Sequence, residues 1–199
     1  MFNFFKKQNR NIYLDYAAAT PVREEVIKEM QKAFAFFANP GSIHKDGLLA
    51  KKKLAEMREE VARSLRSRAD EIVFTATGTE SDNLAIRGAV MAFIEKNGDK
   101  KPHIITSKVE HAGVLEVCKA LEKEGLAQVS YIGVSSSGTL DMKSFKEALK
   151  ENTALVSFIH ANNEIGTVLD IKEISKSIRH FKKYTKGDHK SVYPLLHTD

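Results

Sequence analysis

Four polar segments of the chain could carry chemistry, because each directly follows a short apolar run. The first is "TATGTESDN" at 75–83, in which small residues and a glycine lead into a helical pattern. Free backbone N–H groups at the start of a helix, together with the helix dipole, suit a phosphate group. We expect Thr79 to cap this helix, with Asp82 as a weak capping-box partner. A capped helix without a ligand explains the same residues, and the segment matches neither a Walker loop nor a dinucleotide-binding glycine pattern.

The other three segments offer a ring, an amide and an acid. His111 follows "HIITS" at the expected start of a helix, where its flat ring could stack on an aromatic ligand or move a proton. A lone histidine is more often a structural or surface group. The adjacent amides Asn162 and Asn163 follow "ALVSFIH" and either build a turn or donate a hydrogen bond to a ligand oxygen. Asp199 follows the apolar run "YPLLH".

An anion cradle, a flat ring, an amide donor and a carboxylate together match the needs of one ligand, pyridoxal phosphate. Its phosphate binds N–H groups, its ring takes a stacking partner, and its phenolic oxygen accepts a hydrogen bond. An acid beside the pyridine nitrogen keeps that nitrogen protonated, which makes the ring an electron sink. Each of the four signals is weak alone, and their joint order along the chain predicts a pyridoxal phosphate site.

Alternating strand and helix patterns must position these segments. Strands are predicted at 12–14, 71–75, 103–106, 127–134, 154–160 and 193–197, and helices at 22–37, 47–67, 79–97, 112–124, 141–150 and 171–184. Strands that are apolar on both faces indicate an α/β fold, a mostly parallel sheet with helices on both faces. Ligands of such sheets bind outside the carboxyl ends of the strands, where the four polar segments lie.

The composition narrows the class of protein. With 199 residues, 42% of them hydrophobic and a net charge of +5, the chain is one sizeable domain or part of a larger one. Its basic residues are scattered, so direct nucleic-acid binding is not expected. The single cysteine, Cys118, excludes a disulfide framework and a cysteine-rich metal site, and we interpret it as a packing residue. "MFNFFKKQNR" lacks a signal-peptide core and no apolar run spans a membrane, which predicts a cytoplasmic protein.

The motifs resemble those of cysteine desulfurases of the nitrogen-fixation and iron-sulfur-cluster type, within the class V aminotransferase-like branch of fold-type I pyridoxal phosphate enzymes. The resemblance runs through 12–199 and rests on "YLDYAAATP", "NPGSIH", "EIVFTATGTESDNLAI", "HIITSKVEHAGVL", "LVSFIHANNEIGTV" and "LHTD". That family takes sulfur from L-cysteine, leaves alanine, and passes the sulfur on as an enzyme-bound persulfide. The resemblance therefore implies L-cysteine as substrate, a sulfur-acceptor or scaffold protein as partner, a homodimer, and supply of iron-sulfur cluster or tRNA thiolation pathways.

The resemblance also implies a role for each matching residue. Gly78 and Thr79 would bind the cofactor phosphate, and His111 would stack on the pyridine ring as a candidate for proton transfer. Asn163 would face the phenolic oxygen, and Asp199 would pair with the ring nitrogen. The implied domains are an N-terminal arm at 1–20, on the small-domain side, and a truncated pyridoxal phosphate-binding large domain at 21–199.

Parts of the family pattern are missing from the chain. The family carries its Schiff-base lysine, its persulfide-forming cysteine and its substrate-binding arginine beyond the position of Asp199. We therefore expect an N-terminal portion of a cysteine desulfurase that is inactive by itself. A selenocysteine lyase, an aminotransferase of the same class, or a non-catalytic binding module on the same scaffold are the alternatives. The basic link at 183–193 is longer than the family usually has, and no chemistry is assigned to it.

Overall fold

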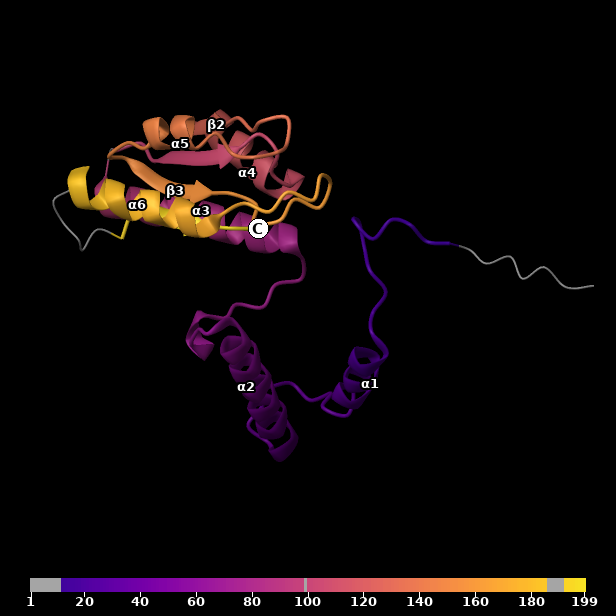
Figure 1. Cartoon of the computed structure of the whole chain (residues 1–199). Coiled ribbons are helices and arrows are strands. Elements are labelled where there is room, and N and C mark those ends of the chain that lie inside the picture. Colours follow the sequence, from indigo (N-terminus) through magenta and orange to yellow (C-terminus); the bar gives the residue numbers. More distant parts are fainter. Residues whose placement is uncertain (1–11, 99, 186–191) are drawn as a thin grey trace, which may run out of the picture. The chain divides into compact units, whose positions relative to one another are not determined.

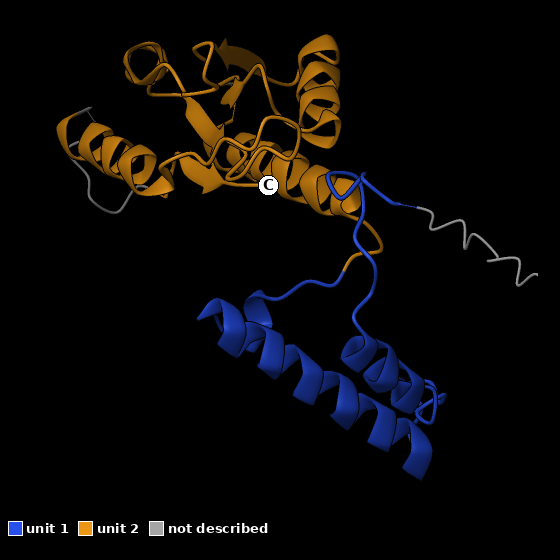
Figure 2. Ribbon diagram, turned by 45° about the vertical axis from the view of Figure 1, so that its right-hand side comes forward, with its two compact units in different colours: residues 1–74 blue, residues 75–199 orange. Residues whose placement is uncertain are grey.

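The computed structural model describes residues 12–98, 100–185 and 192–199. The N-terminal decapeptide and most of the basic link at 183–193 lie outside these ranges. By its internal contacts the chain divides into two units, residues 1–74 and 75–199 (Figure 2). The predicted division into an arm at 1–20 and a large domain at 21–199 stays a prediction. Among the described helices, none combines the length and the apolar character needed to cross a membrane.

The first unit is helical. It contains α1 (Glu24–Ala33), α2 (Lys45–Leu65) and the short 3-10 helix η1 (Ala69–Glu71). His44 caps α2, because its Nδ1 accepts a hydrogen bond from the Gly47 N–H at 3.3 Å. A Cβ at Gly47 would lie 2.5 Å from the carbonyl oxygen of Ser42, so the "NPGSIH" loop folds tightly against the start of this helix. Only three described residues of this unit are buried, Gly47, Ala50 and Ala62.

The strands predicted at 12–14 and 71–75 are wrong. Irregular chain occupies the first position, and η1 with an extended but unpaired segment occupies the second. A strand is stable only when a neighbour satisfies its backbone groups, and none of the described strands pairs with either segment. Val73 and Phe74 remain 66% and 48% exposed, so the apolar pattern here does not reflect burial within the described chain.

The second unit is a parallel sheet with helices on both faces (Figure 1). Its strands are β1 (His103–Ser107), β2 (Gln128–Ile132), β3 (Thr153–Ser157) and β4 (Leu195–His197). Its helices are α3 (Gly78–Asn97), α4 (Ala112–Lys123), α5 (Met142–Ala148) and α6 (Ile171–Thr185). The sheet order is β2-β1-β3-β4, with every pair parallel. This confirms the predicted α/β fold, although the observed β2, β3 and β4 are shorter than the apolar runs suggested.

The two faces of the sheet carry separate cores, because neighbouring side chains of a strand point to opposite faces. Ile104 of β1 packs in a cluster with α3 and α4, which includes the buried Cys118. Ile105 packs in a second cluster with α5 and α6, which includes Phe145 and Ile174. Burial raises the pKa of the Cys118 thiol to about 12, which confirms the interpretation of Cys118 as a packing residue.

The strand order fixes where a ligand can bind. β1 pairs with β2 on one side and with β3 on the other, so the direction of strand addition reverses between β1 and β3. In open α/β sheets, ligands bind outside the carboxyl ends of the strands at such a reversal. The residues that follow Ser107 and Ser157, the last residues of β1 and β3, therefore flank the expected crevice.

A buried histidine joins three strands at the opposite end of the sheet. The ring of His103 lies 3.0 Å from the Thr153 hydroxyl in β3 and 2.9 Å from the Ser130 hydroxyl in β2, measured from Nδ1 and Nε2. Burial lowers the pKa of His103 from 6.5 to about 4. The folded state therefore holds this ring neutral where the unfolded chain would take up a proton.

Replacement of Phe145 tests the α5–α6 core. Phe145 is fully buried and meets Phe158 edge-on, with ring centroids 5.3 Å apart. We expect Phe145→Ala to lower the free energy of unfolding by about 3–5 kcal/mol, because a large cavity remains. Met91→Ala is the matched control, since Met91 is 53% exposed on α3 and its loss should cost about 0.5 kcal/mol or less. Equal effects of the two variants in denaturant titrations would contradict this core.

The His103 ring makes stability depend on pH in a defined window. Because the folded pKa lies below the unfolded value, stability is fully present above about pH 6.5 and is lost as the pH falls toward 4. Between pH 7.5 and 5 this group should cost about 2 kcal/mol of unfolding free energy. His103→Gln should remove that part of the pH dependence. Denaturant titrations at both pH values measure the change in unfolding free energy. If that change were the same in His103→Gln as in the unmodified chain, His103 would not be its source.

Candidate active site

The loop before α3 forms an N–H cradle. Thr77, not Thr79, caps the helix, because the backbone of Thr77 is extended and its hydroxyl accepts from the Glu80 N–H at 3.1 Å. The expectation for Thr79 as the cap is thus wrong. Thr79 instead lies in the first helical turn, and neither its N–H nor that of Gly78 donates to another described residue. Two unpaired donors at a helix start fit a phosphate.

His111 is held in one orientation at the start of α4. Its Nδ1 accepts a hydrogen bond from the Gly113 N–H at 3.1 Å, which leaves Nε2 to carry the proton of a neutral ring. A Cβ at Gly113 would lie 2.9 Å from Oδ2 of Asp82, 3.1 Å from Nδ1 of His111 and 3.6 Å from Oγ1 of Thr79. Gly113 therefore lets Thr79, the His111 ring and the buried Asp82 approach one another.

A group of acids and histidines converges at the end of β4. Side-chain ligand atoms of Asp82, His111 and Asp199 all lie within 4.8 Å of one another. The carboxylate of Asp82 is 3.6 Å from Nε2 of His197, whose Nδ1 lies 2.8 Å from the Ser157 hydroxyl. Burial raises the pKa of Asp82 and nearby Asp199 raises it further, whereas His197 and His111 act in the opposite direction. Burial also lowers the pKa of His197. Asp82 is the buried member of the group, whereas His111 and Asp199 are exposed.

The two adjacent amides have different surroundings. The Asn162 side chain donates to the Val109 carbonyl at 2.8 Å and accepts from the N–H groups of Glu164 and Ile165 at 2.9 and 3.0 Å. Asn162 thus builds the turn after β3 and ties it to the loop after β1. Asn163 is exposed in the same loop, and its role beside a phenolic oxygen stays a prediction.

The sequence alone did not indicate three residues of the candidate site at the carboxyl edge of the sheet, namely Asp82, Gly113 and His197. The sequence pattern suggests only a capping role for Asp82, yet a position three after Thr79 lies on the same face of a helix. The pattern around His197 indicates only a buried strand, yet alternate residues of an extended chain share a side, which places His197 on the side of Asp199. Both spacings were visible signals. The close approach of helices that Gly113 allows depends on tertiary contacts and has no local signal.

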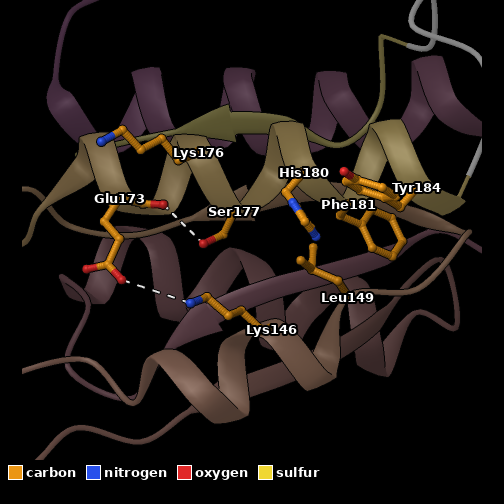
Figure 3. A pocket seen from close by; sticks show the side chains of 8 residues that line it. All are labelled: Lys146, Leu149, Glu173, Lys176, Ser177, His180, Phe181 and Tyr184. Atoms are coloured by element: carbon orange, nitrogen blue, oxygen red, sulfur yellow. Dashed lines mark hydrogen bonds and ion pairs between the residues drawn. The ribbon is translucent and has the colours of Figure 1, made fainter.

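A groove of about 400 Å³ lies between α3 and α4. Thr79, His111 and Gly113 are among the residues that line it, and the Arg87 guanidinium donates two hydrogen bonds of 3.1 Å to the Glu124 carboxylate. A larger cavity of about 670 Å³ lies between α5 and α6, on the other face of the sheet (Figure 3). None of the predicted site residues lines this cavity, whereas Thr79 and His111 line the smaller groove.

The side chains around the larger cavity are mainly basic and aromatic. In Figure 3, Lys146 of α5 points toward Glu173 of α6, and the two form an ion pair at 4.0 Å. Both side chains are about half exposed, so such a pair contributes little to stability. His180 and Tyr184 stack at one end, with ring centroids 4.4 Å apart. This cavity is a surface feature of the α5–α6 layer.

The chain matches the family model described as aminotransferase class V over residues 12–189, and it belongs to that family. Within the family its curated relatives are cysteine desulfurases. It is 44% identical over 180 residues to cysteine desulfurase IscS of Dictyoglomus turgidum, covering 90% of this chain and 44% of that protein. It is 40% identical over 189 residues to putative cysteine desulfurase IscS 1 of Bacillus subtilis, covering 94% of this chain and 48% of that protein.

Solved structures agree with the family relationship. A NifS-like protein superimposes with a TM-score of 0.82 at 34% identity, covering 94% of this chain and 48% of that one. The structure of SspA in complex with cysteine gives a TM-score of 0.80 at 36% identity, covering 94% and 50%. The resemblance inferred from the motifs is thus confirmed. The chain spans about half the length of the curated relatives it matches.

Two glycines of helical segments should respond to alanine with opposite signs. Gly113→Ala should lower the free energy of unfolding by about 1–3 kcal/mol, because its Cβ would press on Asp82 and His111. Gly88→Ala in α3 should raise it by about 0.5–1 kcal/mol, because nothing lies within 4 Å of the new Cβ and alanine favours the helix. Denaturant titrations compare the two. A stabilising Gly113→Ala would contradict the close approach described here.

Proposed function

We propose that this chain forms the cofactor-binding part of a pyridoxal phosphate-dependent cysteine desulfurase. One observation carries the proposal. Thr79 and His111 flank Gly113, and side-chain atoms of His111 and Asp199 lie within 4.8 Å of each other at the carboxyl edge of the sheet. This proximity supports the roles that the motifs suggest for these residues as phosphate partner, ring partner and ring-nitrogen acid. The family relationship supports the same conclusion.

The residues present fit pyridoxal phosphate. The unpaired N–H groups of Gly78 and Thr79, with the Thr79 hydroxyl, would hold the phosphate. His111, fixed through Nδ1, would present its ring to the pyridine, and Asp199 would pair with the ring nitrogen. Asn163 would supply the amide near the phenolic oxygen. When bound, the cofactor supplies an electron sink that stabilises negative charge on the substrate carbon.

The chain's own residues would bind and orient the cofactor and move protons. Because Nδ1 of His111 accepts from Gly113, the Nε2 side is the one available for a ligand or a proton. We assign neither the Schiff-base lysine nor the persulfide cysteine within these residues. Cys118 is buried with a raised thiol pKa, which does not suit a sulfur carrier.

The proposal for the whole protein follows the family reaction. L-cysteine would be converted to alanine, and the sulfur would pass as a persulfide to an acceptor or scaffold protein. Iron-sulfur cluster assembly or tRNA thiolation would receive it. We further propose a homodimeric, cytoplasmic enzyme, in which residues 1–20 form an arm and residues 21–199 belong to the large domain. The 199 residues alone should bind the cofactor without turning over L-cysteine.

Cofactor binding to the full chain tests the site. We expect pyridoxal phosphate to bind, as followed by equilibrium dialysis, and Asp199→Asn to weaken binding about 10-fold or more, because a charge-assisted hydrogen bond is lost. Glu147→Gln is the matched control, since it removes an exposed acid from α5 on the other face of the sheet. Borohydride treatment should leave no cofactor covalently attached. An unchanged affinity in Asp199→Asn, or no binding at all, would overturn the proposal.

A further inference from the structure

Asp82 is a buried acid to which the proposed function assigns no role. It lies in the first turns of α3 and is only 4% exposed. A carboxylate is rarely buried unless other groups offset its loss of hydration. The first turn of a helix favours a negative charge, but Asp82 is five residues beyond the cap, so the dipole contributes little here. Its surroundings must therefore account for its burial.

Two residues of the sheet, Ser157 and His197, position the Asp82 side chain. The Ser157 hydroxyl, at the end of β3, lies 2.8 Å from Nδ1 of His197 and fixes the imidazole in β4. The other nitrogen, Nε2, faces the Asp82 carboxylate at 3.6 Å and forms an ion pair with it when the ring is protonated. Burial lowers the pKa of His197, so the neutral ring is the favoured form and the contact is then one between polar groups. A continuous set of polar contacts thus runs from β3 through β4 to α3. It gives the Asp82 carboxylate a fixed position beside the carboxyl edge of the sheet.

The fixed carboxylate lies beside the acid proposed for the ring nitrogen. Oxygen atoms of Asp82 and Asp199 are within 4.8 Å of each other, and a nitrogen of His111 is equally close. Two carboxylates at this separation repel each other, although solvent weakens the repulsion because Asp199 is exposed and only Asp82 is buried. A cation that binds to one of them relieves that repulsion, so the pair attracts a positive ligand group more strongly than either acid alone.

We propose that Asp82 is a positioning residue of the cofactor site, acting through Asp199 as a second carboxylate that strengthens binding of a protonated ring nitrogen. His197 and Ser157 hold Asp82 in place for this purpose. The inference rests on the proposed function, because it takes Asp199 as the partner of the ring nitrogen. It adds a second, more deeply buried acid to the single acid of the site.

The charged groups around Asp82 agree with this role. Those that face it are His197 and Asp199 at the end of β4 and His111 at the start of α4. Glu110, buried before α4, also interacts with Asp199 and bonds the Ser107 hydroxyl. Burial and Asp199 raise the pKa of Asp82, while the two histidines lower it. A protonated ring nitrogen would act like the histidines and favour the charged acid.

The test compares pyridoxal phosphate with its 1-deaza analogue, in which carbon replaces the ring nitrogen. In the full chain, Asp82→Asn should weaken binding of pyridoxal phosphate about tenfold, equivalent to one pKa unit of the ring nitrogen. Binding of the deaza analogue should change less than about twofold, because it carries no charge at that position. With ¹⁵N-labelled cofactor, the pKa of the bound ring nitrogen should fall by about one unit.

Control variants separate the possible outcomes. Glu95→Gln removes an exposed acid from the far end of the same helix, α3, and should affect neither ligand. Asp82→Glu keeps the carboxylate and should therefore retain more of the preference for pyridoxal phosphate over the deaza analogue than Asp82→Asn does. If Asp82→Asn does not fold, His197→Asn is measured in its place. Loss of the His197 ring leaves the charge on Asp82 but no longer holds its carboxylate in position, so the preference for pyridoxal phosphate over the deaza analogue should again fall. Measurements in EDTA keep divalent cations away from the three donor side chains.

Each result decides one of the two claims. Equal weakening for both ligands in Asp82→Asn would mean a purely structural role and would overturn this inference. If Asp199→Asn abolishes the preference while Asp82→Asn retains it, the inference fails and the proposed function stands. If Asp199→Asn also retains the preference, or the chain does not bind pyridoxal phosphate, the proposed function fails and this inference fails with it. A preference that appears only with added divalent cation would also overturn the inference.

Discussion

Parallel pairing of β1 with β3 is the constraint on which the site depends. The pairing places the ends of two strands from distant parts of the sequence side by side, with β4 joined to the far edge of β3. His111 follows β1, the loop with Asn162 and Asn163 follows β3, and Asp199 follows β4. The three segments therefore lie at the same edge of the sheet although they are far apart in the sequence. The separate cores on the two faces keep the sheet in place, and the loops at its carboxyl edge are left to carry polar groups.

The convergence also needs α3 and α4 to approach closely. Gly113 is the point of approach, since any larger residue would meet the Asp82 carboxylate and the His111 ring. The helix starts thus contribute the cradle and the ring, while the strand ends contribute the acid and His197. Polar groups gather where backbone donors, a buried carboxylate and imidazoles can offset one another's loss of hydration. Packing and electrostatics are therefore satisfied at the same place.

Much of this arrangement could be predicted from the sequence. The helix periodicities, the parallel sheet and the polar residues after the strands are local patterns, and the structure confirms them. The strand predicted at 71–75 failed because apolar character does not supply a pairing neighbour. The cap was placed at Thr79 instead of Thr77 because both residues can cap, and only backbone geometry decides. Asp82 and His197 were missed because their meeting depends on how α3 lies against β4.

The hydrogen bond from Asn162 to the Val109 carbonyl joins the loop after β3 to the loop that carries His111. Because Asn162 also holds the turn that contains Asn163, a displacement of either loop strains the other. This one hydrogen bond therefore ties the backbone beside the ring to the backbone beside the amide, although the two segments lie about fifty residues apart in the chain.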